Sequence, residues 1–126
     1  MADQNQLALL QQGAKVWNDW RAGRDVRVDL SSADLHGKDL TGADLRGATL
    51  VDAKLRGAKL GPGALLWNAA LSRADLYQAD LSGADLQDVD FTGGDLFETK
   101  LREANLQGAN LSKANGGLRT EQLAPI

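Results

Sequence analysis

Residues 33–47 read ADLHG KDLTG ADLRG, three five-residue units in a row with leucine at the centre of each. The same spacing runs from Leu30 to Leu111 and slips by a single residue near Gly63. A period of five matches neither a helical turn of about 3.6 residues nor the two-residue repeat of a flat strand, so the unit is itself the structural element. Seventeen large apolar centres are predicted to form the core: Leu30, Leu35, Leu40, Leu45, Leu50, Leu55, Leu60, Leu66, Leu71, Leu76, Leu81, Leu86, Phe91, Leu96, Leu101, Leu106 and Leu111.

Small and polar residues alternate before each centre. Alanine stands two positions before the centre in twelve of the seventeen units, and aspartate is the usual residue one position before it. Residues two apart in an extended chain point to the same side, so alanine and leucine face inward while aspartate faces solvent. Lys38 occupies an inward position near the start of the array. Because a buried charge is costly, its stem is expected to run out toward the N-terminal end.

The chain must turn once in every unit, and the residue two after the centre is placed to make the corner. Seven units have glycine there, which adopts the positive φ of a type II turn without steric cost. Four corners return the chain to its starting direction, so twenty residues make one square coil, and about four coils stack about 4.8 Å apart. Type I corners are expected where other residues follow the centre: Ser32, Asp52, Arg73, Glu98 and Glu103.

The units ADLHG, ADLRG, ADLYQ, ADLSG, ANLQG and ANLSK resemble the repeats of the pentapeptide repeat family. The resemblance covers residues 28–115. It implies an all-β solenoid, a right-handed quadrilateral β-helix. The segment WNDWR at residues 17–21 also resembles the helical caps of bacterial members, cyanobacterial ones included.

The two ends of such a solenoid need covers, because each would expose unpaired backbone and apolar interior. We expect a single domain with a helical cap at 1–27, the β-helix at 28–115 and a short cap at 116–126, where Thr120 begins a turn that lays Leu118 and Leu123 over the last coil. Gly23 is placed as the C-terminal cap of a helix over residues 4–22. Its apolar face is Leu7, Leu10, Ala14 and Trp17, widened by Leu9, Val16 and Trp20.

Composition predicts a non-catalytic protein. His36 is the only histidine, there is no cysteine, and neither G-x-x-x-x-G-K nor G-x-G-x-x-G occurs, so no catalytic, cofactor or metal residues are predicted. The aspartates recur every five residues and are interpreted as a solvated layer that hydrogen-bonds backbone at the corners. With no signal peptide or membrane-spanning segment visible, we expect a cytoplasmic monomer or weak dimer that binds neither nucleic acid nor membrane.

The slip lies in the segment Gly61, Pro62, Gly63. If the extra residue sits at that corner, Ala64 and Leu66 point inward, and Leu65 and Trp67 point outward. A register centred on Leu65 would instead expose Leu66 and Trp67. In either register a leucine and an indole lie together outside the tube, where they serve as a docking patch for a partner or fold back over the irregular corner.

A second group of candidate interaction residues comes from stacking. Residues twenty apart, corrected for the slip, form an outward column of His36, Arg56, Tyr77 and Phe97. Tyr77 and Phe97 are adjacent in this column. They offer aromatic surface to a partner, or they stack on each other as cross-strand neighbours worth about 0.2–1 kcal/mol.

The distribution of surface charge tests one function that the family resemblance implies, the mimicry of DNA. Several members resemble B-form DNA in size and surface charge and bind DNA gyrase, so a DNA-mimicking topoisomerase binder is the alternative. Here acids and bases alternate in two columns, Asp34, Lys54, Asp75, Asp95 and Asp39, Lys59, Asp80, Lys100, whereas a DNA mimic needs a continuous acidic surface. The sequence therefore favours a non-catalytic structural or protein-interaction module whose protein partner it does not identify.

Overall fold

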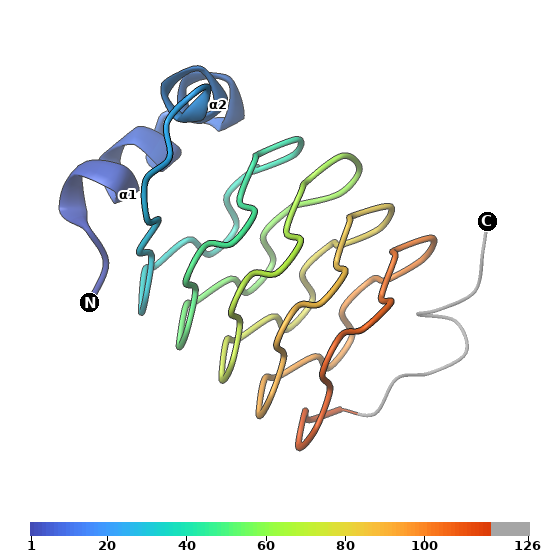
Figure 1. Cartoon of the computed structure of the whole chain (residues 1–126). Coiled ribbons are helices and arrows are strands. Elements are labelled where there is room, and N and C mark those ends of the chain that lie inside the picture. The colour runs from blue at the N-terminus through green and yellow to red at the C-terminus, as the bar shows by residue number, and fades with distance from the viewer. Residues whose placement is uncertain (117–126) are drawn as a thin grey trace.

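The computed structural model describes residues 1–116, which form two short helices followed by a stack of square coils (Figure 1). Helix α1 spans Gln4–Gln11 and helix α2 spans Ala14–Arg21. Within these residues, neighbouring coils meet through single-residue parallel bridges rather than longer strands, because a corner interrupts the chain every five residues. No helix in this part of the chain has the length and apolarity needed to cross a bilayer.

The bridges run in four columns, one for each side of the square, and every bridging residue except Asn115 stands directly before a centre. The spacing is twenty residues except across the slip, where it is twenty-one, so the predicted columns are confirmed. The first side is Asp29, Thr49, Ala70, Asp90 and Asn110; the second is Asp34, Lys54, Asp75, Asp95 and Asn115; the third is Asp39, Lys59, Asp80 and Lys100; the fourth is Asp44, Leu65, Asp85 and Asn105.

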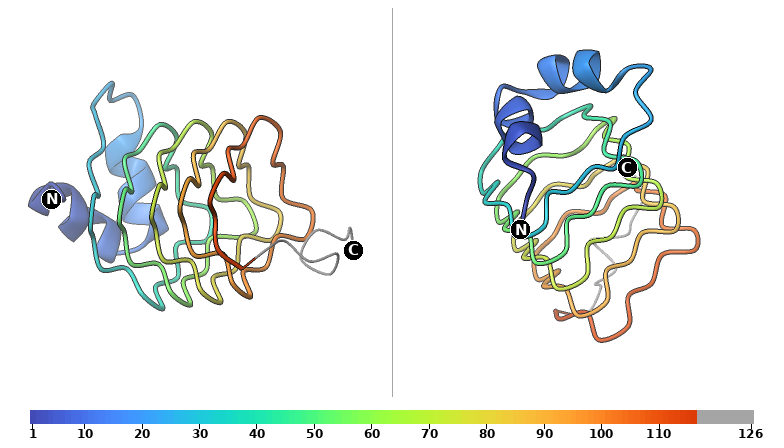
Figure 2. Two further views of the ribbon diagram at one scale, coloured as in Figure 1. Left: turned by 90° about the horizontal axis from the view of Figure 1, so that it is seen from below. Right: turned by 60° about the vertical axis from the view of Figure 1, so that its left-hand side comes forward.

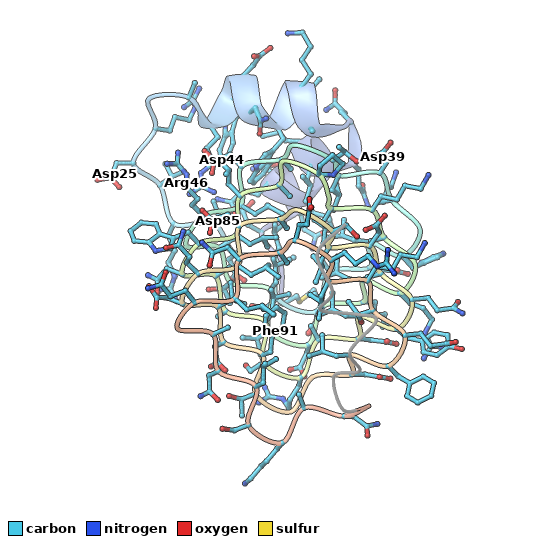
Figure 3. The ribbon with its side chains drawn as sticks, turned by 90° about the vertical axis from the view of Figure 1, so that its right-hand side faces the viewer. Asp25, Asp39, Asp44, Arg46, Asp85 and Phe91 are labelled. Atoms are coloured by element: carbon cyan, nitrogen blue, oxygen red, sulfur yellow. The ribbon has the colours of Figure 1, made fainter. Side chains whose placement is uncertain are left out.

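Leucine and alanine fill the tube, as expected for a one-dimensional core. Leu81 in the middle of the stack is fully buried, and Figure 3 shows Phe91 inside the tube. Leu106 and Leu111 are predicted to be core but are only half-buried, because no further described coil packs on them. The centres that are at most 1 % exposed are Leu30, Leu35, Leu40, Leu45, Leu50, Leu55, Leu60, Leu66, Leu71, Leu76, Leu81, Leu86, Phe91, Leu96 and Leu101.

The outward aspartates bond to the corners as predicted. Asp90 is typical: one carboxylate oxygen accepts from the backbone N–H of Thr92 at 2.9 Å. In the part of the chain that the structure describes, nine aspartates, Asp90 included, and two asparagines near the C-terminal end make this bond to the N–H two residues on. These side chains therefore hold the turns, which accounts for their five-residue period.

The expected type I corners are wrong. All five non-glycine residues for which they were predicted have φ between 58° and 61°, in the same left-handed region as the corner glycines: Ser32, Asp52, Arg73, Glu98 and Glu103. A uniform corner is required because successive coils hydrogen-bond through it. For example, the N–H of Arg73 donates to the carbonyl of Thr92 at 2.9 Å.

The slip follows the first of the two predicted registers. Leu66 is fully buried, whereas Leu65 and Trp67 are exposed. The peptide bond between Gly61 and Pro62 is cis, and the extra residue is taken up at this corner.

The cap consists of two helices rather than one, since the chain breaks after α1 at Gly13, whose φ is 107°. The helices lie over the N-terminal end of the stack (Figure 2). Leu10 and Trp17 are fully buried there, while Val16, predicted to widen the apolar face, is 38 % exposed. Gly23 follows α2 with φ of 71°, the conformation expected of a residue that ends a helix.

Two side-chain amides in the cap replace the missing preceding coil. On the first side, Gln6 accepts from the N–H of Asp29 at 2.8 Å and donates to the carbonyl of Arg27 at 2.8 Å. On the fourth side, Asn18 accepts from the N–H of Asp44 at 2.8 Å and donates to the carbonyl of Gly42 at 2.9 Å. Each carboxamide oxygen thus accepts the hydrogen bond that a carbonyl of the preceding coil accepts elsewhere in the ladder, while the carbonyls of Asp29 and Asp44 accept from the N–H of Asp3 and the indole N–H of Trp17.

The second and third sides receive no such bonds. Within residues 1–116, no hydrogen bond joins the cap to the backbone N–H or C=O of Asp34 or Asp39. Lys38 lies between these two sides and is half-buried rather than enclosed, which agrees with a stem that runs outward. The predicted C-terminal cap, with Thr120, Leu118 and Leu123, lies outside the described residues.

Candidate functional site

The six predicted interaction residues lie at two different corners. A square coil has four corners, and the bridge columns place Trp67 at the one after the fourth side. The column of Arg56, Tyr77 and Phe97 follows the second side, so it lies diagonally across the tube. The structure therefore separates Leu65 and Trp67 from His36, Arg56, Tyr77 and Phe97, and the two groups do not form one surface.

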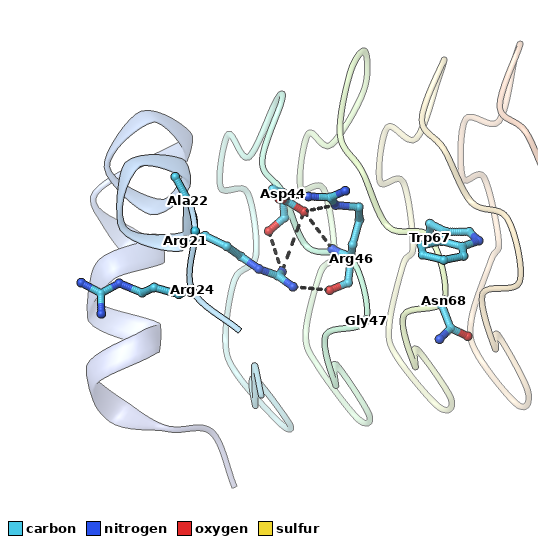
Figure 4. Close-up of a pocket in the computed structure, with 9 residues that line it drawn as sticks. Arg21, Ala22, Arg24, Asp44, Arg46, Gly47, Trp67 and Asn68 are labelled. Carbon is cyan, nitrogen blue, oxygen red and sulfur yellow. Dashed lines mark hydrogen bonds and ion pairs between the residues drawn. The ribbon is translucent and has the colours of Figure 1, made fainter. Parts of the chain in front are cut away.

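Trp67 borders a surface groove between the end of α2 and the first two coils. Its side chain is 48 % exposed, and Leu65 on the adjoining side is 36 % exposed. The groove has a volume of about 310 Å³. The groove is open at Gly47, because a Cβ atom built on this glycine would have no other atom within 4 Å. We call this the Trp67 groove, and the lining residues that matter below are Arg21, Arg24, Asp44, Arg46, Trp67 and Asn68 (Figure 4).

An arginine from the cap and one from the first coil share a single aspartate in the groove. Arg21 donates to the backbone carbonyls of Asp44 at 2.9 Å and Arg46 at 2.5 Å. Arg46 donates two hydrogen bonds of 2.8 Å each to the Asp44 carboxylate. The guanidinium of Arg21 lies 3.9 Å from that carboxylate. The α2 end is thereby held against the coil, and two cations face one anion.

This arrangement favours the charged forms of Asp44 and Arg46. The hydrogen bond from Arg46 is the largest influence that lowers the pKa of Asp44, and the nearby charge of Arg21 adds to it. Reciprocally, the hydrogen bond to Asp44 raises the pKa of Arg46. The groove therefore carries an excess positive charge across the whole neutral pH range.

Sequence reasoning identified Trp67 but missed Arg21, Asp44 and Arg46 as its neighbours. Arg46 and Asp44 are ordinary members of a repeat, and nothing in their spacing separates them from the other aspartates and corner residues. The available signal was the segment WNDWR, because Trp17, Asn18 and Arg21 all bond to the fourth side of the first coil. The sequence does not predict which side of the coil this segment contacts.

At the diagonally opposite corner, the predicted residues Arg56, Tyr77 and Phe97 contact one another from coil to coil. The Tyr77 and Phe97 rings stack with centroids 6.1 Å apart and an interplanar angle of 9°. The guanidinium of Arg56 lies 4.8 Å from the Tyr77 centroid and pairs with Asp75. A hydrogen bond to Glu98 raises the pKa of Tyr77. The fourth predicted member, His36, bonds instead to the carboxylate of Asp34 at 2.6 Å.

The groove offers cations, an indole and amide groups, which are binding groups rather than an acid and a base aligned on a nucleophile. Among residues 1–116, no three side chains of histidine, aspartate or glutamate are grouped so as to hold a metal ion. The geometry therefore suits recognition of another molecule.

Comparison with known proteins agrees with this architecture. The family model described as pentapeptide repeats matches residues 26–61, 63–93 and 95–116. Among solved structures, the pentapeptide repeat protein Rfr23 from the cyanobacterium Cyanothece 51142 is 32 % identical with a TM-score of 0.60, over 70 % of this chain and 63 % of that one. The chain thus spans less than two thirds of that relative's length.

A second solved structure, alr5209 from Nostoc PCC 7120, is also a pentapeptide repeat protein. It is 42 % identical with a TM-score of 0.50, over 73 % of this chain and 69 % of that one. No curated protein matches the chain in sequence. The repeat register, the four bridge columns and the family match lead to one conclusion: this chain belongs to the pentapeptide repeat family and has its right-handed quadrilateral β-helix fold.

Proposed function

We propose that this chain is a non-catalytic protein-interaction module that binds its partner through the Trp67 groove. The observation that supports the proposal is an indole 48 % exposed at the edge of a hollow of about 310 Å³. Tryptophan and arginine are the residues that most often dominate binding energy at protein interfaces, since they bury large areas in well-packed pockets. Burial of the exposed indole would contribute about 25 cal/mol for each Å² of apolar surface.

The rigid setting of the groove supports the same function. Arg21 and Arg46 are held by hydrogen bonds within the chain, and the coil behind Trp67 is anchored by the fully buried Leu66. A partner would therefore meet a preformed surface and lose little free energy to ordering it. By contrast, the rings at the opposite corner already stack on each other, so a partner gains less by covering them.

A comparative pull-down tests the proposal. Wild type, Trp67→Ala and Phe97→Ala are used as baits in native lysate, and recovered proteins are quantified. Phe97 is the matched control, because it is similarly exposed at 41 % but lies at the opposite corner. We expect partners that are retained by Phe97→Ala and lost by Trp67→Ala at unchanged thermal stability. Recovery of the same proteins at the same level by both variants would refute binding through the groove.

The alternative of a DNA-mimicking topoisomerase binder gains no support from the charge columns. Lys54 stands between Asp34 and Asp75, and Lys59 stands between Asp39 and Asp80, so acidic runs are interrupted. We expect micromolar protein to leave DNA supercoiling by gyrase unchanged. A turnover that disappears in a folded point variant would count against the non-catalytic assignment.

A further inference from the structure

We propose that the partner segment recognised by the Trp67 groove is acidic and carries an apolar side chain next to its carboxylate. This inference rests on the proposed function and adds the chemistry of the partner. It starts from the local charge: Arg21 and Arg46 face one carboxylate, that of Asp44, which leaves one positive charge uncompensated, and Arg24 adds a second positive charge at the edge of the groove. The whole chain, in contrast, has a net charge of −3.

The three arginines act differently. Arg21 is only 16 % exposed and is committed to two backbone carbonyls, so it contributes a fixed charge to the floor. Arg24 points away from Asp44 and toward α2 (Figure 4). There its Nε donates to the Trp20 carbonyl, and its guanidinium lies 5.5 Å from the centroid of the Trp20 ring. Its charge therefore acts on a ligand through the local field rather than by contact.

Arg46 is the arginine that a ligand can touch. It is 54 % exposed and uses Nε and Nη2 on Asp44, while its Nη1 has no partner among residues 1–116. Arginine presents its donors in a planar fork that matches a carboxylate. Because Arg21 already lies beside the same aspartate, a second carboxylate near Arg46 would neutralise a charge that Asp44 leaves uncompensated.

Trp67 supplies the apolar half of the site. It follows Arg46 in the same corner column, one coil further along, so its indole lies next to the cationic floor. An extended segment with an acidic residue near Arg46 would therefore bring a neighbouring side chain over the indole. Nucleic acid is the less suitable occupant, because an acidic chain lacks the extended basic surface that phosphate backbones require.

Fluorescence anisotropy with three labelled peptides tests this chemistry: Gly-Asp-Glu-Phe-Glu-Gly, the same peptide with lysine for each acid, and the same peptide with glycine for phenylalanine. We expect the acidic phenylalanine peptide to bind most tightly and to weaken as salt is raised. Arg46→Gln should weaken it about fivefold to tenfold, and Trp67→Ala by a similar factor. Arg56→Gln is the matched control, since Arg56 is 59 % exposed and also pairs with one aspartate.

Three results would overturn the inference: equal or tighter binding of the lysine peptide, equal effects of Arg46→Gln and Arg56→Gln, or absence of binding by the acidic peptide. Tighter binding of a labelled single-stranded oligonucleotide, lost in Arg46→Gln, would also overturn it. These outcomes are separate from failure of the proposed function. If the pull-down depends on Trp67 but the peptides show no preference for acid, the interaction module stands and only its acidic partner is rejected.

Discussion

At the scale of single residues, the position of a corner decides backbone conformation more strongly than residue type does. Within residues 1–116, nine non-glycine residues have positive φ, and charged side chains such as Arg73 and Glu98 are among them. A left-handed residue with a Cβ costs about 1–2 kcal/mol, and the bonds between coils must offset this cost. The aspartates and asparagines that cap the corners contribute to that offset.

Glycine is required for two different reasons in this fold: positive φ at Gly57 and the lack of space for a Cβ at Gly61. Gly57 has φ of 69° and open space around a built Cβ, whereas a Cβ at Gly61 would lie 1.8 Å from the backbone oxygen of Ser82. We expect Gly57→Ala to lower the free energy of unfolding by about 1 kcal/mol through backbone strain alone. Gly61→Ala should lower it by about 3 kcal/mol, because backbone must move. Urea unfolding of both variants is the measurement, and equal losses would contradict the steric role of Gly61.

At the scale of elements, the helical cap works by imitating a coil. Gln6 and Asn18 place carboxamides where peptide groups would stand, on two of the four sides. Trp17 adds a bond from its indole N–H to the carbonyl of Asp44 at 2.7 Å while its rings cover the core. Between the two remaining sides stands Lys38, a half-buried lysine at the open edge, and a charge at an edge discourages pairing there.

The cap interpretation predicts an asymmetry between two asparagines. Asn18→Ala leaves the N–H of Asp44 and the carbonyl of Gly42 without their side-chain partner, while the bonds from Trp17 and Arg21 to the carbonyl of Asp44 remain. We expect a loss of about 1–3 kcal/mol in the free energy of unfolding. Asn5→Ala is the control, because Asn5 is an exposed α1 residue in which the same change only raises helix propensity slightly. Similar stabilities of the two variants, measured by urea unfolding, would show that the carboxamide is dispensable.

At the scale of the whole molecule, stability depends on a layer of ionised aspartates. Hydrogen bonds from Ser31, His36, Thr41 and Thr92 are the largest influences that lower the pKa values of Asp29, Asp34, Asp39 and Asp90, respectively. A group whose pKa is lower in the folded state stabilises the fold above its unfolded pKa, about 3.9 for aspartate. That contribution disappears as the pH falls through the folded pKa.

We therefore expect the urea midpoint to be insensitive to these groups above about pH 5 and to fall steadily below about pH 4. Asp90→Asn should retain the corner bond, because Asn110 makes the same bond one coil further along. The variant should lose less stability than wild type between neutral and acidic pH. An identical pH dependence in the two proteins would mean that Asp90 does not contribute to acid unfolding.

The repeat, the four columns, the buried leucines and the outward Trp67 can all be predicted from the amino-acid sequence. These follow from a short period, because each unit contacts only its neighbours and the register repeats. Tertiary structure decided what depends on contacts between distant or irregular segments. It split the cap at Gly13 and made the corners uniform. It also brought Arg21 to Asp44, twenty-three residues away, because the cap must satisfy the open edge of the first coil.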